Sequence, residues 1–357
     1  MGRPDVISLG VGEPDFPVPW RIREQMIYSL EKGITSYTSN HGLPELREEI
    51  VRYYRKFGVE ANAEDVIVTT GVSEGIDLVL RAILNPGDGV LIPEPAYVSY
   101  KPLTVLAGGE AIPIPTTPNF KPTYELLMRY AKGSYPKAIV LNYPNNPTGV
   151  SYSKKELEEI ADFAIELDLI VISDEIYAEL TYTGKHISIA SLNGMEERTV
   201  ILNGFSKAFA MTGFRIGYVI APSDIVDAML KIHQYCMLCA PITAQIGAIE
   251  ALKGCESELE RIRAEYMRRR NFFVKRLSKI FEVRRPDGAF YAFPKIDSYG
   301  LSSEEFAERL LLEKGVAVVP GNAFGDCGEG YIRCAYAVSM EKLKVAVDRI
   351  EDFVRKL

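Results

Sequence analysis

Seven short apolar runs, rich in β-branched residues, constrain the fold of this chain more than any other feature. They are Val66–Thr69, Val90–Ile92, Ala111–Ile114, Ala138–Leu141, Leu169–Ser173, Thr199–Leu202 and Ile216–Ile220. Most are continuous, with no polar residue at every second position, which is typical of strands that are buried on both faces. Helical patterns lie between many of them, for example at Gly75–Leu84 and Lys154–Leu167. Strands that alternate with helices predict a mostly parallel α/β sheet.

The last third of the chain has a different pattern. Apolar residues recur at helical spacing from Leu259 to Ile280 in a charged background, which predicts one amphipathic helix of about seven turns. Short strands and two further helices follow, at Gly288–Phe293, Ser303–Glu313, Val316–Val319, Tyr331–Val338 and from Met340 onward. We therefore expect a large domain of residues 34–250. We expect a smaller α+β domain of residues 251–357 together with residues 1–33, which contain the predicted strand Val6–Leu9 and the predicted helix Arg21–Lys32.

The composition excludes several classes of protein. The 357 residues include 41 Lys and Arg against 48 Asp and Glu, a net charge of −7, which does not suit a nucleic-acid binder. The longest stretch without a charged residue, Ile232–Ile249, contains His233 and Pro241 and is not a membrane span. Met1–Asp5 contains no apolar signal-peptide core. Five scattered cysteines argue against a disulfide framework, so we expect a cytoplasmic protein.

A metal site is not expected. The chain has only three histidines, and no second cysteine pair follows Cys236 and Cys239. We interpret these two cysteines as buried thiols one helical turn apart.

The sequence Gly71-Val-Ser-Glu-Gly75 allows three interpretations. It matches the nucleophile elbow of hydrolases, which also requires an acid and a histidine later in the chain, where only His186 and His233 follow. It equally suits a glycine turn at a helix N-terminus, which offers backbone N–H groups and a hydroxyl to a phosphate. The glycines could also serve the turn alone.

Polar residues follow several of the predicted strands at the point where each strand ends. They are Asn142–Gly149, Ser173–Tyr177 and Gly204–Lys207, with Arg215 beside the last predicted strand. Ligands bind at the carboxyl ends of strands in α/β sheets. The set suits a carbonyl cofactor, because a lysine forms a Schiff base, a carboxylate pairs with a ring nitrogen, and an arginine with hydroxyls holds a phosphate.

With these motifs the sequence resembles the class I/II aminotransferases, pyridoxal-phosphate (PLP) enzymes of fold type I, and most closely their archaeal aromatic/aspartate-type members. The resemblance covers essentially the whole chain. Its motifs are Gly12–Asp15, Tyr37 with the glycine and Leu-Arg that follow it, Asn146–Gly149, Ser173–Tyr177, Ser206-Lys207, Arg215 and Arg333. It implies a seven-stranded, mostly parallel sheet sandwiched by helices, a smaller α+β domain, and a homodimer with shared active sites.

The same resemblance implies roles around the cofactor ring. Lys207 would form the Schiff base with PLP and later move the proton. Asp174 would pair with the protonated ring nitrogen. Tyr177 and Asn146 would hydrogen-bond the phenolic oxygen, and Tyr97 would stack on the ring face.

By the resemblance, the cofactor phosphate would lie between several groups. Ser206 and Arg215 would bind it together with the backbone and hydroxyl of Val72 and Ser73. Tyr37 would reach the phosphate of the other subunit.

Substrate binding is assigned by the resemblance to Arg333, Asn146 and Gly12. Arg333 would take the substrate α-carboxylate with both arms of its guanidinium, a geometry that matches a carboxylate. Gly12 would close over the site. The alternative for Arg333 is an internal salt bridge, since an unpaired arginine within an apolar strand is unfavourable.

The implied reaction is a ping-pong exchange of the amino group between an L-amino acid (aromatic and/or aspartate, glutamate) and a 2-oxo acid such as 2-oxoglutarate. Some dicarboxylate-specific relatives carry a lysine at the position of Ser73, and its absence removes one way of binding a distal carboxylate. We expect a broad enzyme that takes aromatic amino acids and glutamate, and the alternative is a plain aspartate site whose distal charge is met by another group. A PLP-dependent β-eliminase (C–S lyase) on the same fold is one alternative. A non-catalytic PLP-binding regulator is another, although the sequence contains no basic helix-turn-helix segment and retains Lys207.

Overall fold

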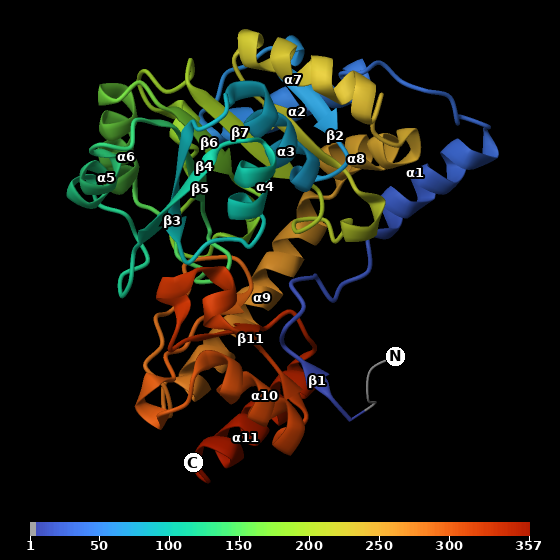
Figure 1. Ribbon diagram of the computed structural model, residues 1–357. Helices are drawn as coiled ribbons and strands as arrows, with labels where there is room; N and C mark the ends of the chain where they lie inside the picture. The colour runs from blue at the N-terminus through green and yellow to red at the C-terminus, as the bar shows by residue number, and fades with distance from the viewer. Residues whose placement is uncertain (1–4) are drawn as a thin grey trace.

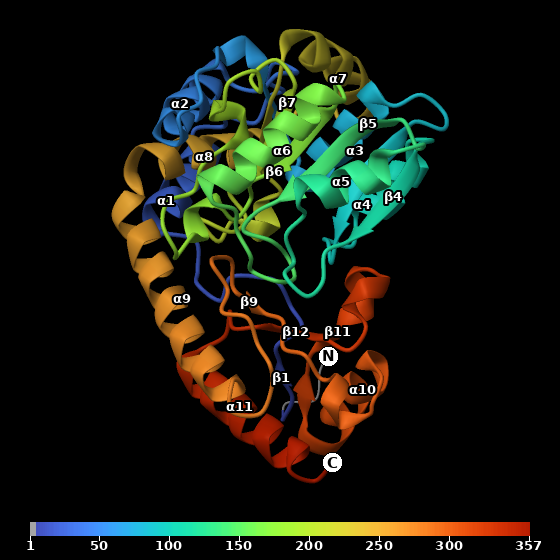
Figure 2. The same cartoon turned by 90° about the vertical axis from the view of Figure 1, so that its left-hand side faces the viewer.

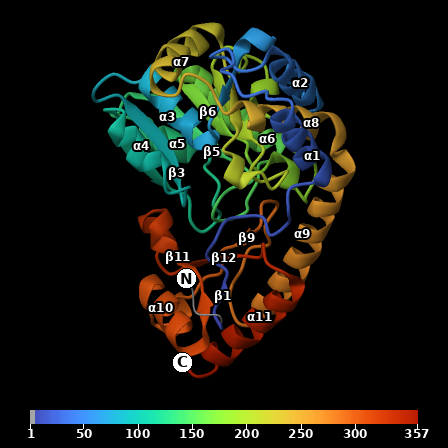
Figure 3. The ribbon, with the colours of Figure 1, turned by 90° about the vertical axis from the view of Figure 1, so that its right-hand side faces the viewer.

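A computed structural model of the chain describes residues 5–357. Residues 1–4, which belong to the expected small domain, lie outside the described residues. Figure 1 shows a large body above a smaller one that is formed mostly by the C-terminal third. Helix α9 (Glu256–Leu277) runs along one side from the large body into the small body, as Figures 2 and 3 show. Its 22 residues make about six turns, one fewer than expected.

The large body is built on a seven-stranded sheet. In spatial order its strands are β2 (Val66–Thr69), β8 (Gly217–Ile220), β7 (Thr199–Gly204), β6 (Ile170–Asp174), β5 (Pro136–Asn142), β3 (Gly89–Glu94) and β4 (Glu110–Pro115). Strands β4, β3, β5, β6 and β7 are parallel, and β8 runs antiparallel to both of its neighbours. All seven predicted strands lie in this sheet, which confirms the predicted fold class.

Helices cover both faces of the sheet. Along β5, Ala138 and Val140 pack in a core with α3 (Val72–Ile83) and α7 (Ser223–Cys236), and α4 (Tyr100–Leu106) begins at the same core. The alternate residues of β5, Ile139 and Leu141, pack in a second core with α5 (Tyr124–Ala131) and α6 (Lys154–Glu166). Successive side chains of a strand point to opposite faces, so the continuous apolar runs of the sequence reflect burial on both sides.

The small body combines short strands with three helices. Strand β1 (Ile7–Ser8) pairs in parallel with β10 (Val316–Ala317). Strands β11 (Val319–Pro320), β12 (Ile332–Ala335) and β9 (Tyr291–Ala292) form an antiparallel sheet in that order. Helices α10 (Ser303–Lys314) and α11 (Met340–Val354) share one apolar core with these strands and with α9 from Ile262 onward.

The N-terminal helix does not lie where the sequence suggested. Helix α1 (Trp20–Glu31) buries Ile22 and Met26 in the core that contains α2 (Pro44–Tyr54) and α8 (Ile242–Gly254) of the large body. A Cβ atom added to Gly247 of α8 would lie 2.8 Å from the Met26 sulfur, so the two helices pack closely. The assignment of the Arg21–Lys32 helix to the small domain is therefore wrong. The chain crosses from β1 to the large body before α1 begins.

Two other expectations concern cysteines and metals. Cys236 is exposed and Cys239 only partly buried, so their interpretation as two buried thiols is wrong. Helix α7 ends at Cys236, and the two residues do not share a helical face. In residues 5–357 no three His, Cys, Asp or Glu side chains are grouped so that they could hold a metal ion. No helix in this range is long and apolar enough to cross a membrane.

Candidate active site

A cavity of about 320 Å³ opens at the carboxyl ends of β3, β5, β6 and β7, where the large body meets β9 and β12 of the small body. Its lining includes eleven of the twelve residues that the sequence singled out. They are Gly12, Val72, Ser73, Tyr97, Asn146, Asp174, Tyr177, Ser206, Lys207, Arg215 and Arg333. Tyr37 lies outside the cavity and is 84% exposed.

Asp174 ends β6 and is buried on the floor of the cavity. Its carboxylate accepts hydrogen bonds from the Tyr100 hydroxyl at 2.6 Å and from the backbone N–H of Ile176 at 3.1 Å. Burial raises the pKa of Asp174 to about 6, although both hydrogen bonds favour the ionised form. A cation next to this carboxylate would stabilise the ionised form further.

Lys207 follows β7 and is partly buried. Its Nζ donates a hydrogen bond of 2.7 Å to the carbonyl oxygen of Gly12. Burial lowers the pKa of Lys207 to about 8, and the positive charges of Arg215 and Arg333 act in the same direction. About a tenth of the amine is therefore neutral, and so nucleophilic, at pH 7, and about half at pH 8.

One end of the cavity suits a phosphate. The first turn of α3 directs backbone N–H groups that have no partner within the helix toward it, and Ser73 lies on this turn. The Arg215 guanidinium lies beside the turn, since a Cβ atom on Gly71 would be 2.6 Å from its Nη2. Gly71 also has φ 85°, a left-handed conformation that favours glycine. Ser206 lines the same cavity from the end of β7.

Arg333 comes from β12 of the small body and is buried. It donates to Asn146 Oδ1 at 2.9 Å and to the carbonyl oxygen of Gly10 at 2.5 Å. Its guanidinium lies over the rings of Tyr291 and Phe324, 4.6 and 4.8 Å from their centroids. The Nε atom is buried and has no hydrogen-bond partner. Within residues 5–357 Arg333 forms no ion pair, so the internal salt bridge considered as its alternative role is absent from the described structure.

Three hydrogen bonds order the remaining lining. The hydroxyl groups of Tyr177 and Tyr291 lie 2.7 Å apart, which joins the end of β6 to β9 of the small body. Asn142 at the end of β5 accepts a hydrogen bond from the backbone N–H of Asn146 at 2.9 Å and donates one to the Asp174 carbonyl oxygen at 3.0 Å. The Asn142–Asn146 turn is thereby fixed against the end of β6.

The nucleophile-elbow interpretation of Ser73 lacks a general base. His233 contacts Glu74, with 2.6 Å between Nδ1 and Oε1, and His186 contacts Glu175 at 2.9 Å. Neither histidine lines the cavity with Ser73. The structure gives this motif the geometry of an anion-binding helix terminus.

Sequence reasoning missed six lining residues: Ile76, Tyr100, Asn142, Ile176, Thr212 and Tyr291. Asn142 and Ile176 could have been found, because they lie within the polar segments Asn142–Gly149 and Ser173–Tyr177 that were already identified, although neither was given a role of its own. Tyr100 and Tyr291 lie in apolar segments and carry no signal that separates them from the other tyrosines, of which the chain has 20.

Comparisons with known proteins agree with this geometry. The sequence model of the family described as aminotransferase class I and II matches residues 4–350. An aspartate aminotransferase of Pyrococcus abyssi is 48% identical over 363 residues, which cover 99% of this chain and 93% of the relative. Aromatic-amino-acid aminotransferase 2 of Thermococcus litoralis is 44% identical over 364 residues, which cover 100% and 93%.

A crystal structure of an aromatic aminotransferase from Pyrococcus horikoshii matches the fold with a TM-score of 0.97. The two chains are 46% identical, and the match covers 99% of this chain and 96% of that one. The chain therefore belongs to the class I and II aminotransferases, the PLP-dependent enzymes that transfer the amino group of an amino acid to a 2-oxo acid.

Proposed function

We propose that the cavity binds PLP and that Lys207, Asp174 and Arg333 carry out transamination of L-amino acids there. One observation carries this proposal: the three charged groups line one cavity, and each is hydrogen-bonded only by neutral groups among the described residues. A ligand that brings an aldehyde, a cationic ring nitrogen and a carboxylate complements all three.

The residues of the cavity fit PLP in detail. When bound, PLP supplies an aldehyde for Schiff-base formation and a ring that withdraws electrons from the substrate α-carbon. Arg215, Ser206 and the first turn of α3, with Val72 and Ser73, would hold the phosphate.

The groups around the ring have separate tasks. Asp174 would hold the proton on the ring nitrogen, and Tyr177 with Asn146 would donate to the phenolic oxygen. Tyr97 would cover one ring face. The Lys207 amine, neutral in part because burial lowers its pKa to about 8, would take the proton from the substrate α-carbon and return it.

The substrate range is proposed to be broad, with aromatic amino acids and glutamate accepted. The guanidinium of Arg333 would bind the α-carboxylate in a bidentate manner, with Asn146 and Gly12 beside it. Once Arg215 binds the phosphate, the described lining residues offer no further arginine for a distal carboxylate, and Ser73 stands where a lysine could have served. Apolar and aromatic groups such as Ile76 and Tyr291 provide surface for a ring.

The assembly is proposed to be a homodimer with shared active sites. Tyr37 is exposed and does not line the cavity of its own chain. A residue that reaches into the site of a neighbouring subunit is expected to look this way when one chain is seen alone. Exposed apolar side chains precede Tyr37 in the sequence, on α1 and the segment that follows, at Trp20, Ile27, Tyr28, Leu30 and Ile34. So many exposed apolar side chains in one segment are typical of a protein–protein interface.

Two further proposals concern the chain as a whole. The large cofactor-binding domain is proposed to span residues 34–250, with α1 packed on it, and the small domain residues 251–357 with β1. A cytoplasmic location is proposed from the five cysteines, all of which are free.

Lys207 should be the residue that binds PLP covalently. Borohydride reduction of the reconstituted enzyme should fix the cofactor on Lys207, located by mass spectrometry of peptides. Because attack requires the neutral amine, cofactor uptake by the apoenzyme should accelerate with rising pH and level off above about pH 8, the pKa of Lys207. The Lys207→Arg variant is the control and should show no reducible adduct. A label on another lysine would contradict the assignment.

Asp174→Asn should still bind PLP but lose transamination by about 100-fold or more, because an amide cannot stabilise a protonated ring nitrogen as a carboxylate does. Steady-state turnover and cofactor absorbance measure the two effects separately. Asp77→Asn is the matched control, since Asp77 pairs with Arg81 on the exposed side of α3. Near-normal turnover of Asp174→Asn is the outcome that refutes the role.

Subunit mixing should reveal shared sites. Lys207→Ala and Tyr37→Ala homodimers should each have low activity, and mixed dimers contain one complete site. Random exchange makes half of the dimers mixed, so activity should recover to about a quarter of the wild-type value. Tyr135→Phe, which changes a tyrosine that is 90% exposed, should leave activity unchanged. A fully active monomer at the assay concentration rules the model out.

Amino-donor preference should favour aromatic substrates. We expect kcat/KM with 2-oxoglutarate to be at least as high for phenylalanine and tyrosine as for aspartate, with alanine as the small reference donor. An aspartate value more than about a hundredfold above both aromatics, roughly 2.7 kcal/mol of transition-state preference, would contradict this expectation. The β-eliminase alternative predicts ammonia release from a cysteine conjugate without any 2-oxo acid, and we expect none.

A further inference from the structure

A second carboxylate lies directly behind the cavity. Glu175 follows Asp174, and because successive side chains at a strand end point to opposite sides, it points away from the cavity and does not line it. Its side chain is completely buried. Two consecutive buried carboxylates are unusual, since each is unfavourable in a protein interior unless it is well satisfied.

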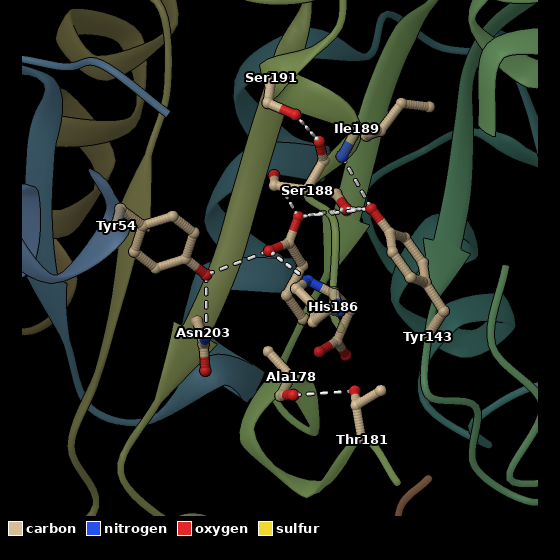
Figure 4. Close-up of polar contacts among 12 residues, drawn as sticks. Tyr54, Tyr143, Ala178, Thr181, His186, Ser188, Ile189, Ser191 and Asn203 are labelled. Atoms are coloured by element: carbon tan, nitrogen blue, oxygen red, sulfur yellow. Dashed lines mark hydrogen bonds and ion pairs between the residues drawn. The ribbon is translucent and has the colours of Figure 1, made fainter. Parts of the chain in front are cut away.

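The Glu175 carboxylate accepts hydrogen bonds on both oxygens. Oε1 accepts from Ser188 Oγ at 2.6 Å and from Ser173 Oγ at 3.0 Å. Oε2 lies 2.9 Å from His186 Nε2 and accepts from the Tyr54 hydroxyl at 3.3 Å. Figure 4 shows His186, Ser188 and Tyr54 directed toward this common centre.

These partners connect the carboxylate to the neighbouring strand ends. The Tyr143 hydroxyl donates to Glu175 at 3.5 Å, and Tyr143 is the first residue after β5, in the turn that ends with Asn146. The Tyr54 hydroxyl also accepts a 2.7 Å bond from Asn203 of β7, four residues before Lys207 (Figure 4).

A carboxylate accepts on both of its oxygens, as the hydroxyl donors of this arrangement require. A glutamine would accept on one oxygen only and would place an NH2 group next to hydroxyl groups that donate to Glu175. An apolar side chain would leave the buried hydroxyls without their acceptor. Among the described residues no lysine or arginine pairs with Glu175, and the partner that can carry a positive charge is His186.

We propose that Glu175 is a positioning residue for transamination: from behind the cavity, its carboxylate ties together the ends of β5, β6 and β7 and thereby sets Asn146, Asp174 and Lys207 relative to one another. This inference rests on the cofactor site proposed above. It differs from a role in stability alone, because it predicts changes in how the bound cofactor is held.

The first test is Glu175→Gln in the full-length enzyme. We expect the dissociation constant of PLP from the apoenzyme to rise about tenfold and kcat to fall about 100-fold, the scale of a small misplacement of reacting groups. The visible circular dichroism of the bound cofactor should also change. Glu156→Gln is the control for lost stability, because it removes the negative charge that pairs with Lys121 near the start of α6, away from the cavity, and keeps the shape of the side chain. It should leave all three readouts unchanged.

The second test separates the connections. Tyr54→Phe and Tyr143→Phe each remove one hydroxyl that contacts the carboxylate and keep the ring. Each should lower kcat about three- to tenfold in the wild-type background, and less than twofold when combined with Glu175→Gln, because residues of one network are not additive. These variants decide the question even if Glu175→Gln fails to fold.

The outcomes are distinct. Wild-type kcat and dichroism in Glu175→Gln, or in both tyrosine variants, would overturn the positioning role, as would an equal loss in Glu156→Gln. A wild-type protein that binds no PLP would instead overturn the proposed function.

Discussion

A sheet covered by helices on both faces leaves its strands only their ends for polar side chains. In this protein the interior positions of β5, β6 and β7 are filled by apolar residues that pack on α3 and α7 on one side and largely on α5 and α6 on the other. Because five neighbouring strands are parallel, their carboxyl ends meet at one edge, and the polar residues that follow them converge there. The location of the cavity is thus a consequence of how the sheet is buried.

Charge then determines what the cavity can bind. Among the described lining residues, Lys207, Arg215 and Arg333 can be positive, whereas Asp174 is the carboxylate. This excess of positive charge attracts anions. The phosphate of a cofactor and the carboxylate of a substrate would be two such anions. The low polarity that raises the pKa of Asp174 also lowers that of Lys207, so a single property of the site adjusts both groups toward neutral pH.

The sequence was informative where local rules decide the outcome. Continuous β-branched runs predicted all seven strands of the large sheet, and the helical pattern at Lys154–Leu167 predicted α6, whose start has a capping box of Ser153 and Glu156. Burial and capping both act on neighbouring residues. Motif order predicted eleven lining residues. The position of α1 could not be predicted, since the apolar face with Ile22 shows that the helix is buried but not which partner covers it. Contacts such as that of Tyr291 with Tyr177 join segments 114 residues apart and leave no local pattern.

The two halves of the site lie on different bodies, and one backbone segment contacts both halves. Arg333 belongs to β12 and Lys207 follows β7, yet both donate to the short segment between β1 and α1, through the carbonyl oxygens of Gly10 and Gly12. A side chain at Gly12 would collide with the Tyr291 hydroxyl, which is itself bonded to Tyr177. The backbone of this segment therefore spans the two bodies at the cavity, as the Glu175 carboxylate spans the strand ends behind it.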